Sequence, residues 1–212
     1  MIKLETCKQL ARWRKMGLDL VPIAVNVSPQ QLMKPNFAAE VDEVIKQYSL
    51  DRRFIEFEIT EGMVMKDMDV CIQQLQYLRS QGHTISVDDF GTGYSSLSYI
   101  KDLPIDVLKI DRSFMQDLSS DKGQQSIVRT IMELAKNLEL KTVAEGVETI
   151  DDHDFLAKLG CDTGQGYLYA KPVDPSDSRI IEMMSEGFTF FDINKKTENQ
   201  ERRPHSNERN ES

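Results

Sequence analysis

Short apolar segments alternate with amphipathic segments along this chain, and this alternation constrains the fold more than any other feature of the sequence. The predicted strands are Val21–Ser28, Phe54–Thr60, Thr84–Asp88, Asp106–Asp111, Lys141–Glu145 and Thr163–Tyr169. The predicted helices are Ile2–Met16, Phe37–Tyr48, Asp67–Ser80, Ser95–Leu103, Gln124–Leu138, Asp151–Leu159 and Ser176–Ser185. Strands that alternate with helices in this way predict a parallel α/β sheet.

Two local features support the predicted helices. Asn36 stands where its side chain can cap the helix that begins at Phe37. In the helix over Gln124–Leu138, apolar residues recur at helical spacing. That spacing predicts a buried stripe made of Ile127, Ile131, Leu134 and Leu138.

The predicted strands have one apolar face and one small or polar face. In Phe54–Thr60, for example, the apolar residues alternate with Glu56, Glu58 and Thr60. Strands of a doubly wound sheet usually bury two apolar faces, so that architecture is the alternative. The pattern favours a TIM-like (β/α) barrel with helices outside and a polar lumen. The sequence holds six βα units, fewer than the eight of a TIM barrel, so the predicted barrel is incomplete.

A polar residue stands near the C-terminal end of each predicted strand. These residues are Asn26, Glu58, Asp88, Lys109, Glu145 and Gln165. In a parallel barrel they converge on one rim, where barrel enzymes place their active sites. Each of them alone is explained as a solvated strand end, but together they predict a joint site. Carboxylates crowded at one rim repel each other, and bound cations would relieve that repulsion.

The stretch Thr84–Gly93, TISVDDFGTG, places two adjacent carboxylates at a strand end. Gly91 and Gly93 follow and allow the backbone to turn sharply. Carboxylate oxygens beside a flexible loop suit a hard divalent cation. A plain strand followed by an Asp-initiated turn explains this stretch alone equally well.

Composition excludes some classes of partner. The net charge of −9 leaves no broad positive surface for a nucleic acid polymer. Cys7, Cys71 and Cys161 lack metal-ligand spacing and are interpreted as buried thiols in a reducing compartment. No apolar run reaches the roughly 18 residues of a membrane span. We therefore expect a cytoplasmic protein, or one on the cytoplasmic side of the membrane if it is part of a longer chain.

The length of 212 residues suits one domain with a sizeable core. We assign residues 1–190 to a barrel domain. Residues 191–212 are polar and almost free of apolar side chains, which predicts a disordered tail.

Six stretches of the sequence resemble the EAL domain, the phosphodiesterase of the bacterial second messenger cyclic di-GMP. They are VNVS (Val25–Ser28), EITE (Glu58–Glu61), DDFGTGY (Asp88–Tyr94), LKIDRSF (Leu108–Phe114), AEGVET (Ala144–Thr149) and GQGY (Gly164–Tyr167). Their order and spacing match the family as well. The resemblance implies a barrel with one reversed strand and hydrolysis of cyclic di-GMP to linear pGpG.

The resemblance also implies roles for individual residues. The implied metal ligands, for two Mg²⁺ or Mn²⁺ ions, are Asn26, Glu58, Asp88, Asp89 and Glu145. Glu145 is in addition the implied catalytic base, and Lys109 holds the attacking water or a phosphate oxygen. A salt bridge from Lys109 to Glu56 or Asp111 is the structural alternative. Ca²⁺ is expected to inhibit.

Further roles concern the loop after Asp89 and the nucleotide. Glu61 is expected to anchor the Asp89–Tyr94 loop. Gln165 is expected to contact the nucleotide or a metal-bound water. Asp111 is expected to assist the metal site and to contact the substrate. The loop and helix after Asp89 are the expected homodimer surface.

The sequence departs from the family in two respects. No Glu-Ala-Leu stretch occurs, although that glutamate is a metal ligand in the family. The two strands that should precede Asn26 are also not found, so we interpret the chain as an N-terminally truncated EAL domain. Poor hydrolysis is then expected from the isolated chain, with sensory or diguanylate cyclase modules upstream in a longer protein. A cyclic di-GMP receptor without activity and a partner-binding remnant are the alternatives.

Overall fold

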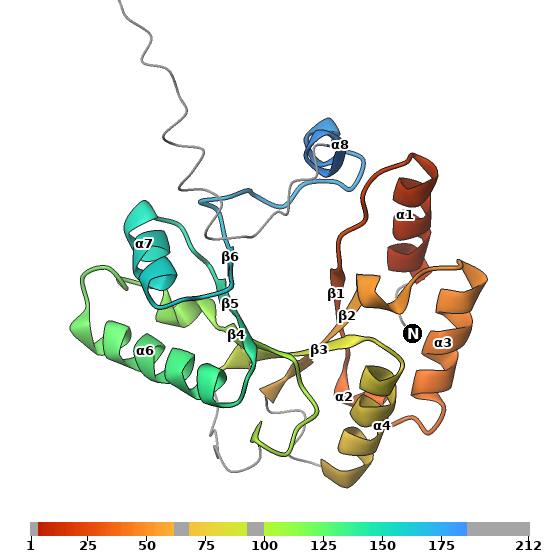
Figure 1. Cartoon of the computed structure of the whole chain (residues 1–212), viewed down its shortest axis with the longest axis horizontal. Helices are drawn as coiled ribbons and strands as arrows, with labels where there is room; N and C mark the ends of the chain where they lie inside the picture. The colour runs from red at the N-terminus through yellow and green to blue at the C-terminus, as the bar shows by residue number, and fades with distance from the viewer. Residues whose placement is uncertain (1–3, 62–67, 93–99, 186–212) are drawn as a thin grey trace, which may run out of the picture.

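The structure is a computed structural model that describes residues 4–61, 68–92 and 100–185 (Figure 1). Its strands are β1 (Ile23–Asn26), β2 (Ile55–Thr60), β3 (Thr84–Phe90), β4 (Val107–Ile110), β5 (Lys141–Glu145) and β6 (Thr163–Gln165). Its α-helices are α1 (Leu4–Lys15), α2 (Pro29–Leu32), α3 (Phe37–Gln47), α4 (Met68–Ser80), α6 (Lys122–Asn137), α7 (Ile150–Lys158) and α8 (Ser178–Ser185). Two short 3₁₀ helices are η1 (Arg52–Phe54) and η3 (Arg112–Phe114).

The strands form one parallel sheet in the order β1-β2-β3-β4-β5-β6. Sheet order follows chain order, so the reversal that defines a doubly wound sheet is missing among the described strands. The helices lie around the outside of the curved sheet (Figure 1). Within the described residues no pairing joins β6 to β1, and both remain edge strands. The predicted fold class, an incomplete TIM-like barrel with six strands, is confirmed.

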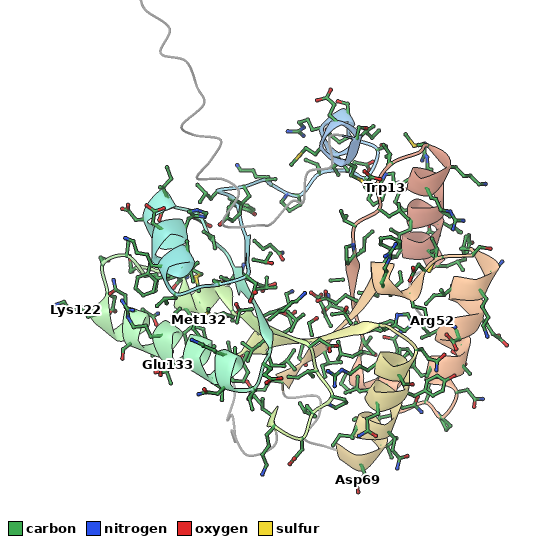
Figure 2. All side chains as sticks on the ribbon, viewed as in Figure 1. Trp13, Arg52, Asp69, Lys122, Met132 and Glu133 are labelled. Atoms are coloured by element: carbon green, nitrogen blue, oxygen red, sulfur yellow. The ribbon has the colours of Figure 1, made fainter. Side chains whose placement is uncertain are left out.

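The hydrophobic core lies between the sheet and the outer helices. The apolar face of β2, formed by Ile55, Phe57 and Ile59, has no exposed surface. Met132 of α6 is 7% exposed and faces the strands, whereas Glu133 next to it points outward (Figure 2). Burial of this apolar face turns the other, polar face of each strand toward the lumen, as the alternation in the sequence predicts.

The prediction that Asn36 caps α3 is wrong. Its side chain makes no capping hydrogen bond, and its backbone (φ −105°, ψ 11°) is not in the extended conformation of a capping residue. A side-chain cap occurs at α2 instead, where Ser28 and Gln31 form a reciprocal capping box.

The predicted stripe of α6 is confirmed at Ile131, and Leu134 and Leu138 pack partly buried against the core, but Ile127 is wrong. Ile127 is 45% exposed, and the buried face consists of Val128, Ile131, Met132 and Ala135. The helix is rotated so that Val128 and Ala135, spaced by two turns, meet the sheet with Ile131 between them. Ile127 therefore falls at the solvent edge of the apolar face.

The last strand is shorter than the prediction for Thr163–Tyr169. The chain turns after Gln165, and the N–H of Tyr169 donates to the carbonyl of Gly166 over 3.1 Å. The predicted helix over Ser95–Leu103 lies largely in residues 93–99, outside the described residues. The predicted tail over 191–212 lies outside them entirely. No helix among the described segments is long and apolar enough to cross a membrane.

Candidate active site

The register of the sheet brings the predicted polar residues to one edge. Asn26 on β1 lies opposite Glu58 on β2, and Glu145 on β5 lies opposite Gln165 on β6. Asp88 on β3 lies opposite Thr60, the last residue of β2. These positions are at or near the C-terminal ends of parallel strands, which is where barrel enzymes carry their catalytic groups. We call Glu58, Asp88, Asp89 and Glu145 the carboxylate rim.

A local irregularity of β3 places two consecutive carboxylates in the same site. Neighbouring side chains of a regular strand point to opposite faces. Here the pairing of β3 with β4 shifts between Val87 and Phe90, and Asp89 has a φ of 56°. Oxygens of Asp88, Asp89 and Glu145 thereby all lie within 4.8 Å of one another. Three carboxylates in that arrangement match the oxygen ligands that a hard divalent cation takes.

Asp88 supplies a second observation that fits a cation. Its Oδ1 atom is buried and accepts no hydrogen bond. A buried carboxylate oxygen without a hydrogen bond is unfavourable, and a metal ion would satisfy it.

Lys109 on β4 stands at the centre of the carboxylate rim. Its Nζ lies 2.5 Å from Oε1 of Glu58, 2.5 Å from Oε1 of Glu145 and 3.4 Å from Oδ1 of Asp88. These are the ion pairs of Lys109 among the described residues. A salt bridge to Glu56 or Asp111, the structural alternative, is therefore wrong: Glu56 lies opposite Thr84, toward the other end of β2. Asp111 instead accepts a hydrogen bond from the N–H of Ser113.

Burial and mutual charge govern the protonation of this cluster. Burial alone would lower the pKa of Lys109, but hydrogen bonds with Glu145 and Glu58 and the charges of both outweigh it, so that pKa is raised. The pKa values of Glu58 and Glu145 are raised as well, first by burial and then by repulsion from Asp88. One ammonium shared among three carboxylates leaves excess negative charge at the rim.

The pKa values of Asp89 and Asp111 are shifted in opposite directions. Desolvation and the charges of Asp88 and Asp111 raise the pKa of Asp89. Burial would also raise the pKa of Asp111, but hydrogen bonds from the Ser113 hydroxyl and backbone prevail and lower it. Asp111 caps η3 through these bonds, so its carboxylate is fixed beside the rim.

Glu61 lies against the turn after β3. Its Oε2 accepts a hydrogen bond from the N–H of Gly91 over 3.1 Å, and the residue is 5% exposed. Gly91 has a φ of 92°, and a Cβ there would lie 2.9 Å from the ring of Phe114. This geometry agrees with a loop-anchoring role for Glu61, which stays a prediction because Tyr94 lies outside the described residues.

The profile of the EAL domain family matches residues 3–172 of this chain. The bifunctional diguanylate cyclase/cyclic di-GMP phosphodiesterase MucR of Pseudomonas aeruginosa is 41% identical over 169 residues, which cover 80% of this chain and 25% of MucR.

The chain belongs to the EAL domain family.

Solved structures agree with this assignment. The EAL domain of Mycobacterium smegmatis DcpA superposes with a TM-score of 0.82 at 38% identity, covering 88% of this chain and 83% of that one. A MucR phosphodiesterase complex with c-di-GMP gives 0.75 at 41% identity, covering 80% and 69%. Klebsiella pneumoniae BlrP1, in a manganese and cyclic di-GMP complex, gives 0.71 at 28% identity, covering 80% and 44%. This EAL chain spans about a quarter of the length of MucR.

The edge strands contribute the less buried residues of the EAL site. Asn26 on β1 and Gln165 on β6 are both exposed at the rim. The carbonyl of Gln165 accepts the N–H of Val147 over 3.0 Å, which ties β6 to the segment after β5. Their exposed side chains are thus accessible to a ligand, as the sequence predicts.

Sequence reasoning missed the packing role of the glycines in the EAL stretches AEGVET and GQGY. A Cβ at Gly146 would lie 2.6 Å from Cβ of Arg112, and one at Gly166 would lie 2.1 Å from the carbonyl oxygen of Val147. A glycine directly after a predicted site residue is the available signal, because it indicates close approach of two backbones.

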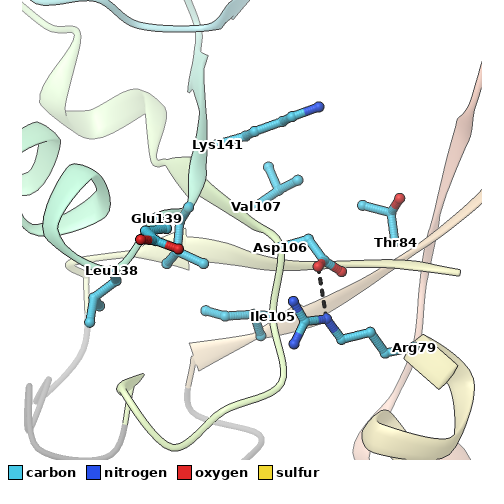
Figure 3. Close-up of a pocket in the computed structure, with 9 residues that line it drawn as sticks. Arg79, Thr84, Ile105, Asp106, Val107, Leu138, Glu139 and Lys141 are labelled. Atoms are coloured by element: carbon cyan, nitrogen blue, oxygen red, sulfur yellow. Dashed lines mark hydrogen bonds and ion pairs between the residues drawn. The ribbon is translucent and has the colours of Figure 1, made fainter. Parts of the chain in front are cut away.

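The far end of the EAL barrel holds a cavity of about 400 Å³ (Figure 3). It is lined by Thr84, Val107 and Lys141, the first residues of β3, β4 and β5. On its wall, Nε of Arg79 lies 2.8 Å from Oδ1 of Asp106 (Figure 3). This cavity opens at the N-terminal ends of the strands, away from the carboxylate rim. Barrel enzymes place their active sites at the C-terminal face, so we do not assign the cavity to the active site.

Proposed function

We propose that this EAL domain hydrolyses cyclic di-GMP to linear pGpG with the help of divalent metal ions. The observation that carries the proposal is the convergence of Asp88, Asp89 and Glu145 beside the ammonium of Lys109. The names of MucR as a phosphodiesterase and of its c-di-GMP complex support the choice of substrate.

The donor set fits the metal that the family implies. Asp88, Asp89 and Glu145 would hold one ion, and Glu58 with the amide oxygen of Asn26 would complete a site for a second. Mg²⁺ or Mn²⁺ is proposed, in line with the manganese complex of BlrP1. When bound, such ions neutralise phosphate charge and lower the pKa of a water ligand.

The residues of the chain have separate parts in the reaction. Glu145 accepts a proton from the attacking water, a task suited to its raised pKa. The water oxygen then bonds to phosphorus, the phosphorus–O3′ bond breaks, and the O3′ oxygen leaves with a proton from solvent. Lys109 holds a phosphate oxygen with its ammonium. Gln165 contacts the nucleotide from β6, and Asp111 positions Asp89.

The test is release of pGpG by the purified chain, followed by chromatography. We expect slow release with Mn²⁺ or Mg²⁺, none in EDTA, and inhibition by Ca²⁺. Recovery on re-addition of Mn²⁺ controls for damage by the chelator. Binding of cyclic di-GMP without any pGpG would contradict hydrolysis.

A cyclic di-GMP receptor without activity is the second candidate. It is favoured by one observation, the absence of a Glu-Ala-Leu stretch from all 212 residues, since that glutamate is a metal ligand of the family. Calorimetry with cyclic di-GMP in Ca²⁺, together with the pGpG assay, separates the two functions.

Assembly and location complete the proposal. We propose a homodimer through the loop and helix after Asp89. We also propose a covalent connection to sensory or diguanylate cyclase domains, because MucR is named as a bifunctional diguanylate cyclase and phosphodiesterase. A cytoplasmic location is proposed as well, because Cys7, Cys71 and Cys161 are all buried thiols.

A further inference from the structure

One lysine occupies the site that the metal ions would use. The ammonium of Lys109 is 2.5 Å from both Glu58 and Glu145. Lys109 is only 6% exposed, so few water molecules can reach its ammonium and replace the two carboxylates. The same oxygens, Oε1 of Glu58 and Oε1 of Glu145, belong to carboxylates assigned above to metal.

The sheet explains why one side chain reaches so many carboxylates. Lys109 lies on β4, between Asp88 on β3 and Glu145 on β5. Its ammonium also extends past β3 to Glu58 on β2. These carboxylates come from three different strands, and without a cation between them they would repel each other in a partly buried place. Lys109 is therefore what holds the rim together when no metal is bound.

We propose that Lys109 is an internal cation that competes with divalent metal for the oxygens of Glu58 and Glu145. Each oxygen that the ammonium holds must be released before it can ligate an ion. Metal loading is thus an exchange of one cation for another, which lowers metal affinity and keeps the metal-free fold stable. The released ammonium becomes available to an anionic phosphate, so loading and binding of a phosphate ligand reinforce each other.

The inference rests on the metal site proposed above and does not require that cyclic di-GMP be cleaved. It differs from a purely structural role in the direction of its effect. If Lys109 only supported the site, its loss would disorder the carboxylates and weaken metal binding. If it competes, its loss strengthens metal binding while the metal-free protein becomes less stable.

The experiment is a titration of the purified chain with Mn²⁺, in which free Mn²⁺ is measured by electron paramagnetic resonance. We expect Lys109→Met to bind Mn²⁺ about tenfold more tightly than the wild type, because the ions no longer displace a charged hydrogen-bond partner. In EDTA the same variant should melt about 5 °C lower or more, and Mn²⁺ should raise its melting temperature more than that of the wild type.

Two further variants serve as controls. Lys141→Met removes the same charge from the exposed N-terminal end of β5 and should leave Mn²⁺ affinity within about twofold. Lys109→Arg restores a positive charge and should return the affinity toward the wild-type value. Folded Lys109→Met with equal or weaker Mn²⁺ binding overturns the competition. Tighter Mn²⁺ binding by Lys109→Met, combined with no pGpG release by the wild type, keeps the competition and contradicts the proposed hydrolysis instead.

A measurement on the wild type covers the case in which Lys109→Met does not fold. In protein labelled with ¹⁵N-lysine, the enclosed ammonium of Lys109 should give a slowly exchanging signal, assigned by its absence from Lys109→Arg. Saturating Mg²⁺ should shift this signal or remove it through faster exchange with water. A signal unchanged at full Mg²⁺ occupancy overturns the proposal.

Discussion

Gly146 and Arg112 approach so closely that a methyl group on Gly146 would lie 2.6 Å from Cβ of Arg112 and 3.2 Å from its Cα. Gly146 also has a φ of 73°, which glycine adopts without strain. The contact joins the end of β5 to η3, so the residue next to Glu145 is locked against the residue next to Asp111. The position of the proposed base is thus set by backbone packing as well as by its ion pair with Lys109.

The first prediction compares two glycines with nearly the same backbone. Gly160 has a φ of 78°, but no atom lies within 4 Å of the Cβ that would be added there. Gly160→Ala should cost about 1 kcal/mol of unfolding free energy, from left-handed strain alone. Gly146→Ala should cost about 1–3 kcal/mol more, because Arg112 must shift. Urea unfolding measures both free energies. Equal losses for the two variants would show that Arg112 can move away from the added methyl group without cost.

The second prediction concerns the contact between α1 and the segment before α8. The indole N–H of Trp13 donates to the carbonyl of Pro175 over 3.1 Å, and Figure 2 places Trp13 between these segments. Trp13→Phe keeps the aromatic packing but loses the donor, so unfolding free energy should fall by about 1 kcal/mol. Trp13→Ala should lose about 3–5 kcal/mol, since packing is lost too. Circular dichroism monitors unfolding, because the variants lack the chain's one tryptophan. A wild-type midpoint for Trp13→Phe would contradict a role for the hydrogen bond.

The rim could be predicted from the sequence because it depends on two local properties. Alternation within each strand decides which residues face the lumen, and the parallel direction places all strand ends at one edge. Residues as far apart as Asn26 and Gln165 therefore reach the predicted rim. Their individual roles toward metal and nucleotide remain predictions.

The partners of Lys109 could not be predicted in the same way. Alternation gives the face of a side chain but not how far it extends along or across the sheet, so Glu56 was as plausible as Glu58. Asp88 and Asp89 lie in the same site because the register of β3 with β4 shifts between Val87 and Phe90. The sequence of β3 does not predict that shift. Likewise, Ile127 has the right spacing for the stripe of α6, but rotation of the helix against the sheet leaves it 45% exposed.

The third prediction concerns pH and His83. This residue is 3% exposed, and burial lowers its pKa from the ordinary value of 6.5. Near pH 6.5, His83 therefore binds a proton in the unfolded chain but stays largely neutral in the folded chain. The stability contributed by neutral His83 is complete above pH 6.5 and is lost as the pH falls below it, by up to about 1.4 kcal/mol per pH unit.

His83→Gln tests this dependence. The glutamine amide can still donate to the carbonyl of Ile55, which lies 3.2 Å from Nδ1 of His83, but it does not titrate. Unfolding free energies from pH 7.5 to pH 5 should fall less steeply for the variant than for the wild type. Parallel curves would mean that His83 takes up its proton in the folded state as easily as in the unfolded one.

The last prediction concerns Glu145 in hydrolysis. Glu145→Gln keeps the size of the side chain and an oxygen ligand, and it can still hydrogen bond to Lys109. It loses the group that accepts a proton, and removal of a general base lowers rates by about 10²–10⁴-fold. We therefore expect pGpG release to fall by that factor, while calorimetry in Ca²⁺ shows cyclic di-GMP binding largely retained. Glu133→Gln, which removes the same charge from the exposed outer face of α6, should release pGpG at the wild-type rate. An active Glu145→Gln variant would show that another group accepts the proton of the attacking water. Loss of cyclic di-GMP binding together with turnover would show that Glu145 serves only to bind the ligand.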